Sequence, residues 1–133
     1  SLEIARNVFL NESAAIRALS SRLDGSFLKA VDLLFRGRGR VIVIGMGKPG
    51  FIAQKVSATF SSTGTPSLFL HPAEALHGDL GLCAAGDLAI LLSNSGATAE
   101  MLRLLKDMVM CFEVDPDHID YPVWKEASNF INE

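Results

Sequence analysis

Residues 91–100 read LLSNSGATAE, and this stretch decides the fold that the sequence predicts. The apolar run at residues 88–92 ends there in small hydroxyl and amide residues, and a helix-forming segment follows. This order predicts a strand, a turn and a helix. The first N–H groups of a helix have no intrahelical partner and the helix dipole is positive at that end. We therefore expect the turn to bind an anion, with phosphate as the default ligand.

The side chains of this turn support the same interpretation. Ser93, Ser95 and Thr98 supply hydroxyl donors, and Gly96 lets the backbone come close to a ligand. The alternative is a capped helix in which the same serines and threonine serve only the fold. Both interpretations are open at this point.

Composition limits the class of protein. A chain of 133 residues suffices for one domain with its own core, and 49% hydrophobic with 20% charged residues is typical of a globular protein. The net charge of −3 argues against nucleic acid as a partner, because non-specific binding needs a basic surface. No apolar run approaches the roughly 20 residues that span a bilayer, and no segment has the pattern of a signal peptide. We therefore expect a cytoplasmic protein with no membrane partner. Cys83 and Cys111 lack the spacing of a metal or redox site, and we expect buried free thiols.

Two helices are expected ahead of any strand. Apolar residues at spacings of three and four predict a helix over residues 2–23, with Glu12 as a polar interruption. Asp24 and Gly25 break it, and Asp24 or Ser26 is a suitable N-cap for a second helix. A helical pair in this position often packs on another subunit, which predicts a homo-oligomer.

Strands and helices then alternate. The first two strands are separated by a helix that stops at Gly64, and the second strand leads into a dense polar loop at residues 71–81. The expected strands are short and continuously apolar: residues 40–44, 67–70 and 88–92. Such strands predict a parallel sheet with helices on both faces. Ligands bind at the carboxyl ends of these strands, so three segments should lie along one edge: 45–50, 71–81 and 93–100.

The first of these segments, residues 45–50 (GMGKPG), has the G-x-G-x-x-G spacing of dinucleotide sites. Such a site needs an acid near the end of the second strand to hold the ribose, and residues 70–72 are Leu-His-Pro. We therefore expect the glycines to permit a tight turn beside a smaller phosphorylated ligand. Lys48, whose position before a proline predicts extended backbone, could offer a cation to a sugar oxygen or phosphate. The alternative for Lys48 is a solvated surface lysine.

Two further side chains are candidates for proton transfer. Glu100 lies in the first turn of its helix, where an acid stabilises the helix anyway, or where it could act as a general base beside a bound phosphate. His77 could move a proton in the cleft, or could simply hold its loop by hydrogen bonds. His71 and His77 stand six residues apart without further ligands, so we expect no metal site.

Four motifs together resemble the sugar isomerase (SIS) domain, and within that superfamily the arabinose-5-phosphate isomerases. The motifs are residues 45–48 (GMGK), 61–66 (SSTGTP), 71–81 (HPAEALHGDLG) and 93–96 (SNSG) followed by Glu100. The third motif is specific to the arabinose-5-phosphate group, and the resemblance runs from near the start of the chain to about Lys106. It implies a flavodoxin-like α/β/α sandwich in a homo-oligomer, a dimer or tetramer, that uses no cofactor. It also implies the interconversion of D-ribulose 5-phosphate and D-arabinose 5-phosphate through an enediol, in the biosynthesis of Kdo and lipopolysaccharide.

The resemblance also implies roles for individual residues. Lys48 and Glu100 match catalytic positions, and His77 matches a histidine that lines the active site. The matching substrate- and phosphate-binding positions are Gly47, Ser93, Asn94, Ser95, Gly96 and Thr98. Pro49 stands where the family usually has a serine, so one hydroxyl that faces the phosphate is replaced.

The expected domain covers residues 1–107, with the helical pair at 2–36 and the strand–helix units at 40–107. Residues 108–133 are unassigned, with a strand at 109–114 and a short helix at 123–131 as the expected elements. The family supplies another glutamate and a histidine from later strand–helix units, which these residues do not match. The alternatives to an isomerase are therefore a non-catalytic phosphosugar sensor and a structural fragment that persists by oligomerising.

Overall fold

The computed structural model describes residues 1–96 and 98–112. Contacts between backbone positions divide the chain into two compact units, Ser1–Phe35 and Arg36–Glu133.

The first unit is helical. It contains α1 (Leu2–Leu19), a single 3-10 turn at Ser20–Arg22, and α2 (Gly25–Arg36), whose last residue is counted with the second unit. The carboxylate of Asp24 accepts hydrogen bonds from the backbone N–H of Ser26, at 2.9 Å, and from its hydroxyl, which confirms Asp24 as the predicted cap. The predicted first helix is confirmed to Leu19, and its last turn tightens into the 3-10 turn.

Neither α1 nor α2 contains a buried residue. Many of the exposed side chains are large and apolar, with Phe9 71% and Phe35 88% exposed. A helix that buries none of its apolar residues gains little from packing, so these faces are suited to cover by another molecule. The exposed set in this unit is Leu2, Ile4, Val8, Phe9, Leu10, Ile16, Leu19, Leu23, Phe27, Leu28, Val31, Leu33 and Phe35.

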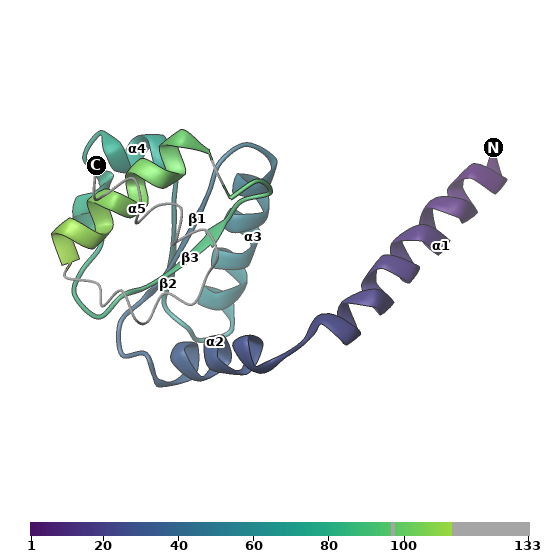
Figure 1. Ribbon diagram of the computed structural model, residues 1–133, viewed down its shortest axis with the longest axis horizontal. Coiled ribbons are helices and arrows are strands. Elements are labelled where there is room, and N and C mark those ends of the chain that lie inside the picture. The colour runs from purple at the N-terminus through teal and green to yellow at the C-terminus, as the bar shows by residue number, and fades with distance from the viewer. Residues whose placement is uncertain (97, 113–133) are drawn as a thin grey trace. The chain divides into compact units, whose positions relative to one another are not determined.

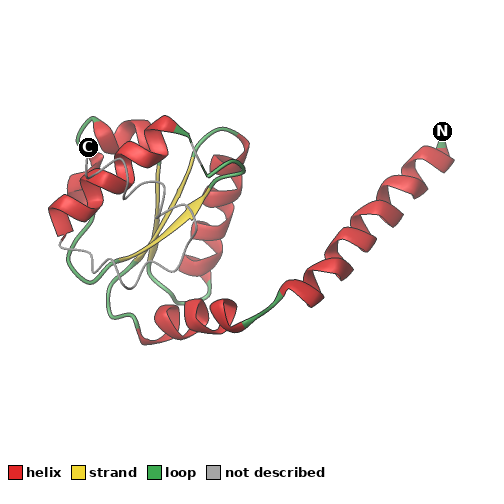
Figure 2. Cartoon of the chain, viewed as in Figure 1, coloured by secondary structure: helices red, strands yellow, loops and turns green. Residues whose placement is uncertain are grey.

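The second unit is built on a parallel sheet (Figures 1 and 2). Among the described residues the sheet has three strands, in the order β2-β1-β3. The strands are β1 (Val41–Gly45), β2 (Ser67–Leu70) and β3 (Leu88–Leu92). All three predicted strands are confirmed, with β1 shifted by one residue. Every residue of β1 is buried because it is the central strand and is covered on both faces.

Helices cover both faces of the sheet, which confirms the predicted α/β/α sandwich. Figure 1 shows α3 (Lys48–Ser62) on one side and α4 (Pro72–Leu76) with α5 (Ala99–Phe112) on the other. On the α3 side, the buried helix residues are small: Gly50, Ala53 and Ser57. On the other side lies a cluster of buried apolar residues: Ile42, Ile44, Leu70, Ala75, Met101 and Leu104.

Two predicted elements were wrong. Residues 71–81 are not a plain loop, because α4 and a 3-10 turn (Asp79–Leu82) occupy most of the segment. The Nδ1 atom of His71 accepts the N–H of Ala73 at 3.2 Å, and Pro72 fits the first helical turn because its missing N–H needs no partner there. Residues 109–112 of the predicted strand belong to α5, since an apolar run alone cannot distinguish a strand from a helix. Residues 113–114, the predicted helix at 123–131, Ala97 and the side chain of Cys111 lie outside what the structure describes.

The edge of the sheet where the strands begin is held by an ion pair between Arg40 and Asp87. The Nη2 atom of Arg40 lies 2.7 Å from Asp87 Oδ2 and 2.6 Å from the carbonyl oxygen of Leu82. The Asp87 carboxylate also accepts the backbone N–H groups of Arg40, at 2.8 Å, and Ala84, at 3.0 Å. Burial alone would raise the pKa of the Asp87 carboxyl, but the hydrogen bonds from Arg40 and Ala84 outweigh burial and hold that pKa below its usual value. The nearby Cys83 is a free thiol that is half-buried rather than buried, and burial raises its pKa, which keeps the sulfur protonated and unreactive.

Two features are absent from residues 1–96 and 98–112. No helix there combines the length and the apolar character needed to cross a membrane. No three His, Cys, Asp or Glu side chains of that part of the chain come together in a group that could hold a metal ion.

Candidate functional site

Two turns meet where β1 and β3 end. Gly45 pairs with Leu92 in the parallel register, so the turns that follow these residues leave the sheet side by side. Together with the start of α5 they form a cavity of about 210 Å³. Its polar lining residues are Ser93, Asn94, Ser95 and Thr98, and its apolar ones are Met46, Pro49, Leu92 and Met101. Four of the predicted phosphate-binding residues are thus brought together.

The turn after β1 is tight, as the glycine spacing predicts. A Cβ atom at Gly45 would lie 2.9 Å from the carbonyl oxygen of Pro49, and one at Gly50 would lie 3.0 Å from that of Gly45. Gly47 has φ +61°, a conformation that other residues rarely adopt. The close backbone contacts at Gly45 and Gly50 and the positive φ of Gly47 account for all three glycines. The glycine spacing therefore does not require a dinucleotide ligand. The cavity is also smaller than the about 300–1,000 Å³ typical of sites for drug-sized ligands, so it suits a small ligand or one end of it.

The start of α5 has the groups that an anion needs. The carbonyl oxygen of Thr98 accepts the N–H of Leu102 at 3.0 Å, which makes Thr98 the N-cap. The N–H groups of the three residues from Ala99 to Met101 therefore have no partner within the helix. Ser93 Oγ accepts the N–H of Gly96 at 3.0 Å, which leaves the hydroxyl proton of Ser93 available to donate. Gly96 has φ +68°, as expected for a turn that requires glycine.

The three predicted catalytic side chains are exposed and do not line this cavity. Lys48 is the first residue of α3, between Gly47 and Pro49, so the prediction of extended backbone at Lys48 was wrong. A proline in the first helical turn is tolerated there because no N–H is needed. Glu100 is the second residue of α5 and is adjacent in sequence to the cavity residue Met101. Lys48 and Glu100 are thus each adjacent in the sequence to a residue that lines the cavity.

His77 ends α4 and is also exposed. Its backbone N–H donates to the carbonyl oxygen of Glu74 at 3.0 Å. Within the described part of the chain, the side-chain hydrogen bond that secures this segment comes from His71 and not from His77. The predicted proton-transfer role of His77 stays a prediction.

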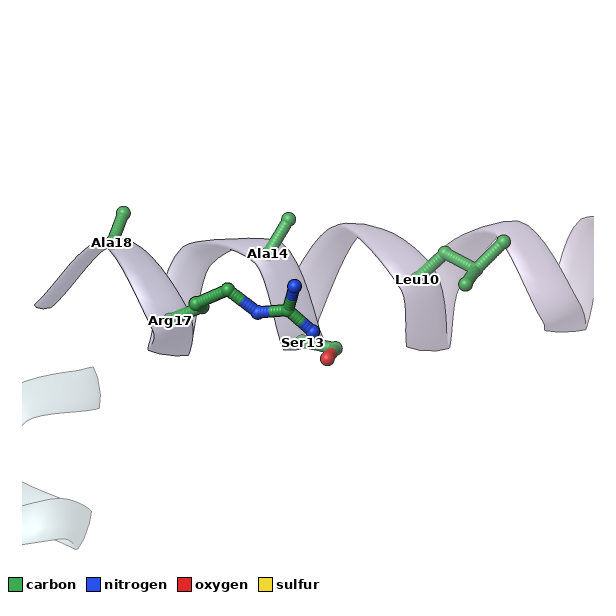
Figure 3. Close-up of a pocket in the computed structure, with 5 residues that line it drawn as sticks. All are labelled: Leu10, Ser13, Ala14, Arg17 and Ala18. Atoms are coloured by element: carbon green, nitrogen blue, oxygen red, sulfur yellow. The ribbon is translucent and has the colours of Figure 1, made fainter. Parts of the chain in front are cut away.

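A second hollow, of about 460 Å³, lies on α1 (Figure 3). Its lining residues are Leu10, Ser13, Ala14, Arg17 and Ala18. Figure 3 shows these side chains spread along one helix. A single helix cannot enclose a ligand, and Arg17 is the one titratable group among these five residues. The larger hollow is therefore an open part of the surface of one helix and is not a candidate active site.

The glycine-containing turn after β1 and the serine-containing turn after β3 lie at one edge of a parallel sheet. This arrangement is typical of a small α/β domain that binds an anion. A model of the SIS domain family matches residues 34–114, and the chain belongs to this family. This confirms the resemblance seen in the sequence.

The chain is similar to named isomerases. It is 52% identical over 94 residues to the arabinose 5-phosphate isomerase KdsD of Pseudomonas aeruginosa, a match that covers 71% of this chain and 29% of the relative. It is 48% identical over 104 residues to the arabinose 5-phosphate isomerase KpsF of Escherichia coli CFT073, covering 77% and 32%. Among solved structures, c3406 of E. coli CFT073 in complex with A5P has a TM-score of 0.78 and 42% identity, covering 82% of this chain and 58% of that one. The chain thus spans about a third of the length of the curated relatives that it matches.

Sequence reasoning missed the apolar half of the cavity. Met46, Leu92 and Met101 were not predicted as site residues, although Met46 directly follows a strand that the sequence identifies as buried. In a parallel sheet this position faces the ligand edge, and that signal could have found Met46.

Proposed function

We propose that this chain belongs to an aldose–ketose isomerase that interconverts D-ribulose 5-phosphate and D-arabinose 5-phosphate. The observation that carries the proposal is the cavity of about 210 Å³ at which serine and threonine residues and the start of α5 converge. The names of the relatives and the A5P complex of the structural neighbour support a phosphorylated pentose as the substrate.

In this proposal the phosphate occupies the polar half of the cavity. The hydroxyl of Ser93 donates to it, and the N–H groups at the start of α5 and the helix dipole stabilise its charge. Gly47, Asn94, Ser95, Gly96 and Thr98 complete the proposed substrate and phosphate site. Binding a remote phosphate holds the carbon chain in place for the chemical step.

The isomerisation moves one proton between neighbouring carbons. A base removes the proton on C2 of the aldose, and the electron pair forms a C1–C2 double bond while the C1 oxygen is protonated. Return of a proton to C1, with loss of the proton on the C2 oxygen, gives the ketose, so atoms and electrons balance. We assign the base to Glu100 and the stabilisation of the developing oxyanion to Lys48, with His77 as a further proton carrier. No metal or cofactor takes part in this scheme.

We also propose that the chain forms a homo-oligomer, a dimer or tetramer, through its first unit. The exposed apolar residues of α1 and α2 support this, because a second copy would remove them from water. The resemblance supports a cytoplasmic role in the biosynthesis of Kdo and lipopolysaccharide. Residues 1–107, with the helical pair 2–36 and the units 40–107, remain our proposed domain.

A phosphosugar sensor is the second candidate. Lys48, Glu100 and His77 lie outside the cavity lining, and this favours a sensor, because a sensor needs only the residues that bind the phosphate. In that case the chain would bind sugar phosphates and turn none over.

One assay separates the two functions. The chain is mixed with D-arabinose 5-phosphate, and D-ribulose 5-phosphate is measured. Turnover that is lost in Lys48→Ala and Glu100→Gln supports the isomerase. Saturable binding without turnover would replace the isomerase with the sensor. A folded chain that neither binds nor reacts contradicts both.

A further inference from the structure

The cavity has two chemically different halves. The polar half offers hydroxyl and amide groups, whereas the other half offers the side chains of Met46, Pro49, Leu92 and Met101. An anion gains nothing from an apolar wall, because it loses hydration there without a hydrogen bond in return. The apolar half therefore suits the C–H groups of the carbon chain that is attached to the phosphate, and not the hydroxyl groups of that chain.

Met46 is held in place by the backbone on both sides. Before it, Gly45 is buried and pairs with Leu92 of β3. After it, the chain turns at Gly47 so tightly that the carbonyl oxygen of Pro49 lies 2.9 Å from the position of a Cβ atom on Gly45. The Met46 side chain therefore starts from a fixed point at the edge of the cavity.

Met46 differs from the other methionine of the cavity. Met101 is 3% exposed and belongs to the buried cluster beneath α5, so any change there disturbs the core. Met46 is half-buried and lies outside that cluster. Its side chain can therefore be shortened without creating a void in the core, unlike that of Met101. Pro49 and Leu92 are half-buried as well, so Met46 shares the accessible part of the apolar wall with them.

We infer that Met46 is a positioning and specificity-determining residue that limits the length of the bound sugar phosphate to five carbons. The inference rests on the proposed phosphosugar function. Beyond Cβ the methionine side chain has a methylene, a sulfur and a methyl group, which together exceed the carbon and oxygen that a six-carbon sugar adds. Shortening this side chain makes room for the longer substrate and removes apolar contact from the shorter one.

The experiment measures binding, so that it does not depend on turnover. The dissociation constants of inorganic phosphate, D-arabinose 5-phosphate and D-glucose 6-phosphate are measured by calorimetry for the unsubstituted chain, Met46→Ala and Met46→Leu. Met108→Ala is the matched control, because Met108 packs against the core from α5 without lining the cavity. A six-carbon sugar adds one hydroxymethylene group. A single methylene in an apolar pocket changes discrimination by about 10–200-fold, and the half-exposed position of Met46 favours the lower end, so Met46→Ala should shift the preference for five over six carbons by about tenfold.

The expected result has three parts. Met46→Ala shifts the preference towards the six-carbon phosphate, Met46→Leu retains the five-carbon preference, and inorganic phosphate binds all three chains alike. A general loss of structure would weaken phosphate as well, so the preference ratio is the diagnostic measurement, and Met108→Ala should leave it unchanged. If Met46→Ala leaves the ratio unchanged while phosphate still binds, this inference is wrong and the proposed function stands. If the unsubstituted chain binds neither phosphate nor a sugar phosphate, the proposed function fails and the inference falls with it.

Discussion

Replacing Ser93 with alanine tests the proposed phosphate site most directly. Ser93 Oγ accepts the N–H of Gly96 at 3.0 Å and lines the cavity with its hydroxyl proton free to donate. Ser93→Ala removes both interactions and adds no new atom.

The two losses have different sizes. A hydrogen bond to a charged group contributes about 1.5–3 kcal/mol, and the exposure of Ser93 favours the lower end, which corresponds to about tenfold weaker phosphate binding. The bond to Gly96 is exposed and neutral, so its loss should cost roughly 0.5–1 kcal/mol of folding free energy. Affinity should therefore fall much more than stability.

The assay is calorimetric titration with inorganic phosphate and with D-arabinose 5-phosphate, next to urea unfolding. Ser62→Ala is the matched control, because Ser62 Oγ also makes a local exposed hydrogen bond, to the carbonyl oxygen of Thr59 at 2.9 Å, at the far end of α3. This control should keep full affinity. Unchanged affinity for both ligands in Ser93→Ala would refute the placement of the phosphate beside this turn.

Three further predictions follow from the core, the ion pair and the helical unit. Leu104→Ala should lower the free energy of unfolding in urea by about 3–5 kcal/mol, because Leu104 is fully buried in the apolar cluster. The control Leu82→Ala changes a half-exposed side chain and should lower it by less than about 1 kcal/mol. The pKa of Asp87 is lowered in the folded chain, so its contribution to stability is present above the unfolded value near 3.8 and is lost as the pH falls through the folded value. Thermal unfolding between pH 2 and 7 should show this acid-induced loss in the unsubstituted chain and a smaller one in Asp87→Asn; equal pH dependence of the two would contradict the role of the ion pair. Phe9→Glu places a charge on the apolar face of α1 and should lower the mass measured by sedimentation, whereas an unchanged mass would show that α1 does not hold the copies together.

The sheet was predictable because each strand is a short apolar run that lies between glycine, proline or polar residues. The apolar runs at residues 67–70 and 88–92 coincide with the bounds of β2 and β3. The central strand β1 is buried at every position because layers of helices cover it on both faces. Asp24 was likewise predictable as a cap, since its side chain suits that position.

The wrong predictions have local causes. Histidine is an unusual N-cap, so the helix that begins after His71 gave no familiar signal. In α5, Met101, Leu104 and Met108 continue a helical spacing of three and four, and this pattern overrides the apolar run that begins at Val109.

The candidate site was predictable in its polar half only. One short stretch of sequence, residues 93–98, contains Ser93, Asn94, Ser95 and Thr98, and its hydroxyl and amide side chains directly follow an apolar run. Met46 and Met101 come from different elements, and their meeting depends on the register of β1 with β3. Assigning Lys48, Glu100 and His77 to chemistry stays a prediction, because their side chains are exposed and do not line the cavity.

The ion pair of Arg40 and Asp87 lies at one end of β1 and the cavity at the other. Five strand residues at about 3.3 Å each separate them by roughly 16 Å. At that separation the energy between two unit charges is about 1 kcal/mol at an effective dielectric constant near 20, which is less than one pKa unit. A bound anion therefore has little influence on the protonation of Asp87. The stability of the fold in acid can therefore be changed by substitutions at Asp87, and the affinity for a ligand can be changed separately by substitutions in the cavity.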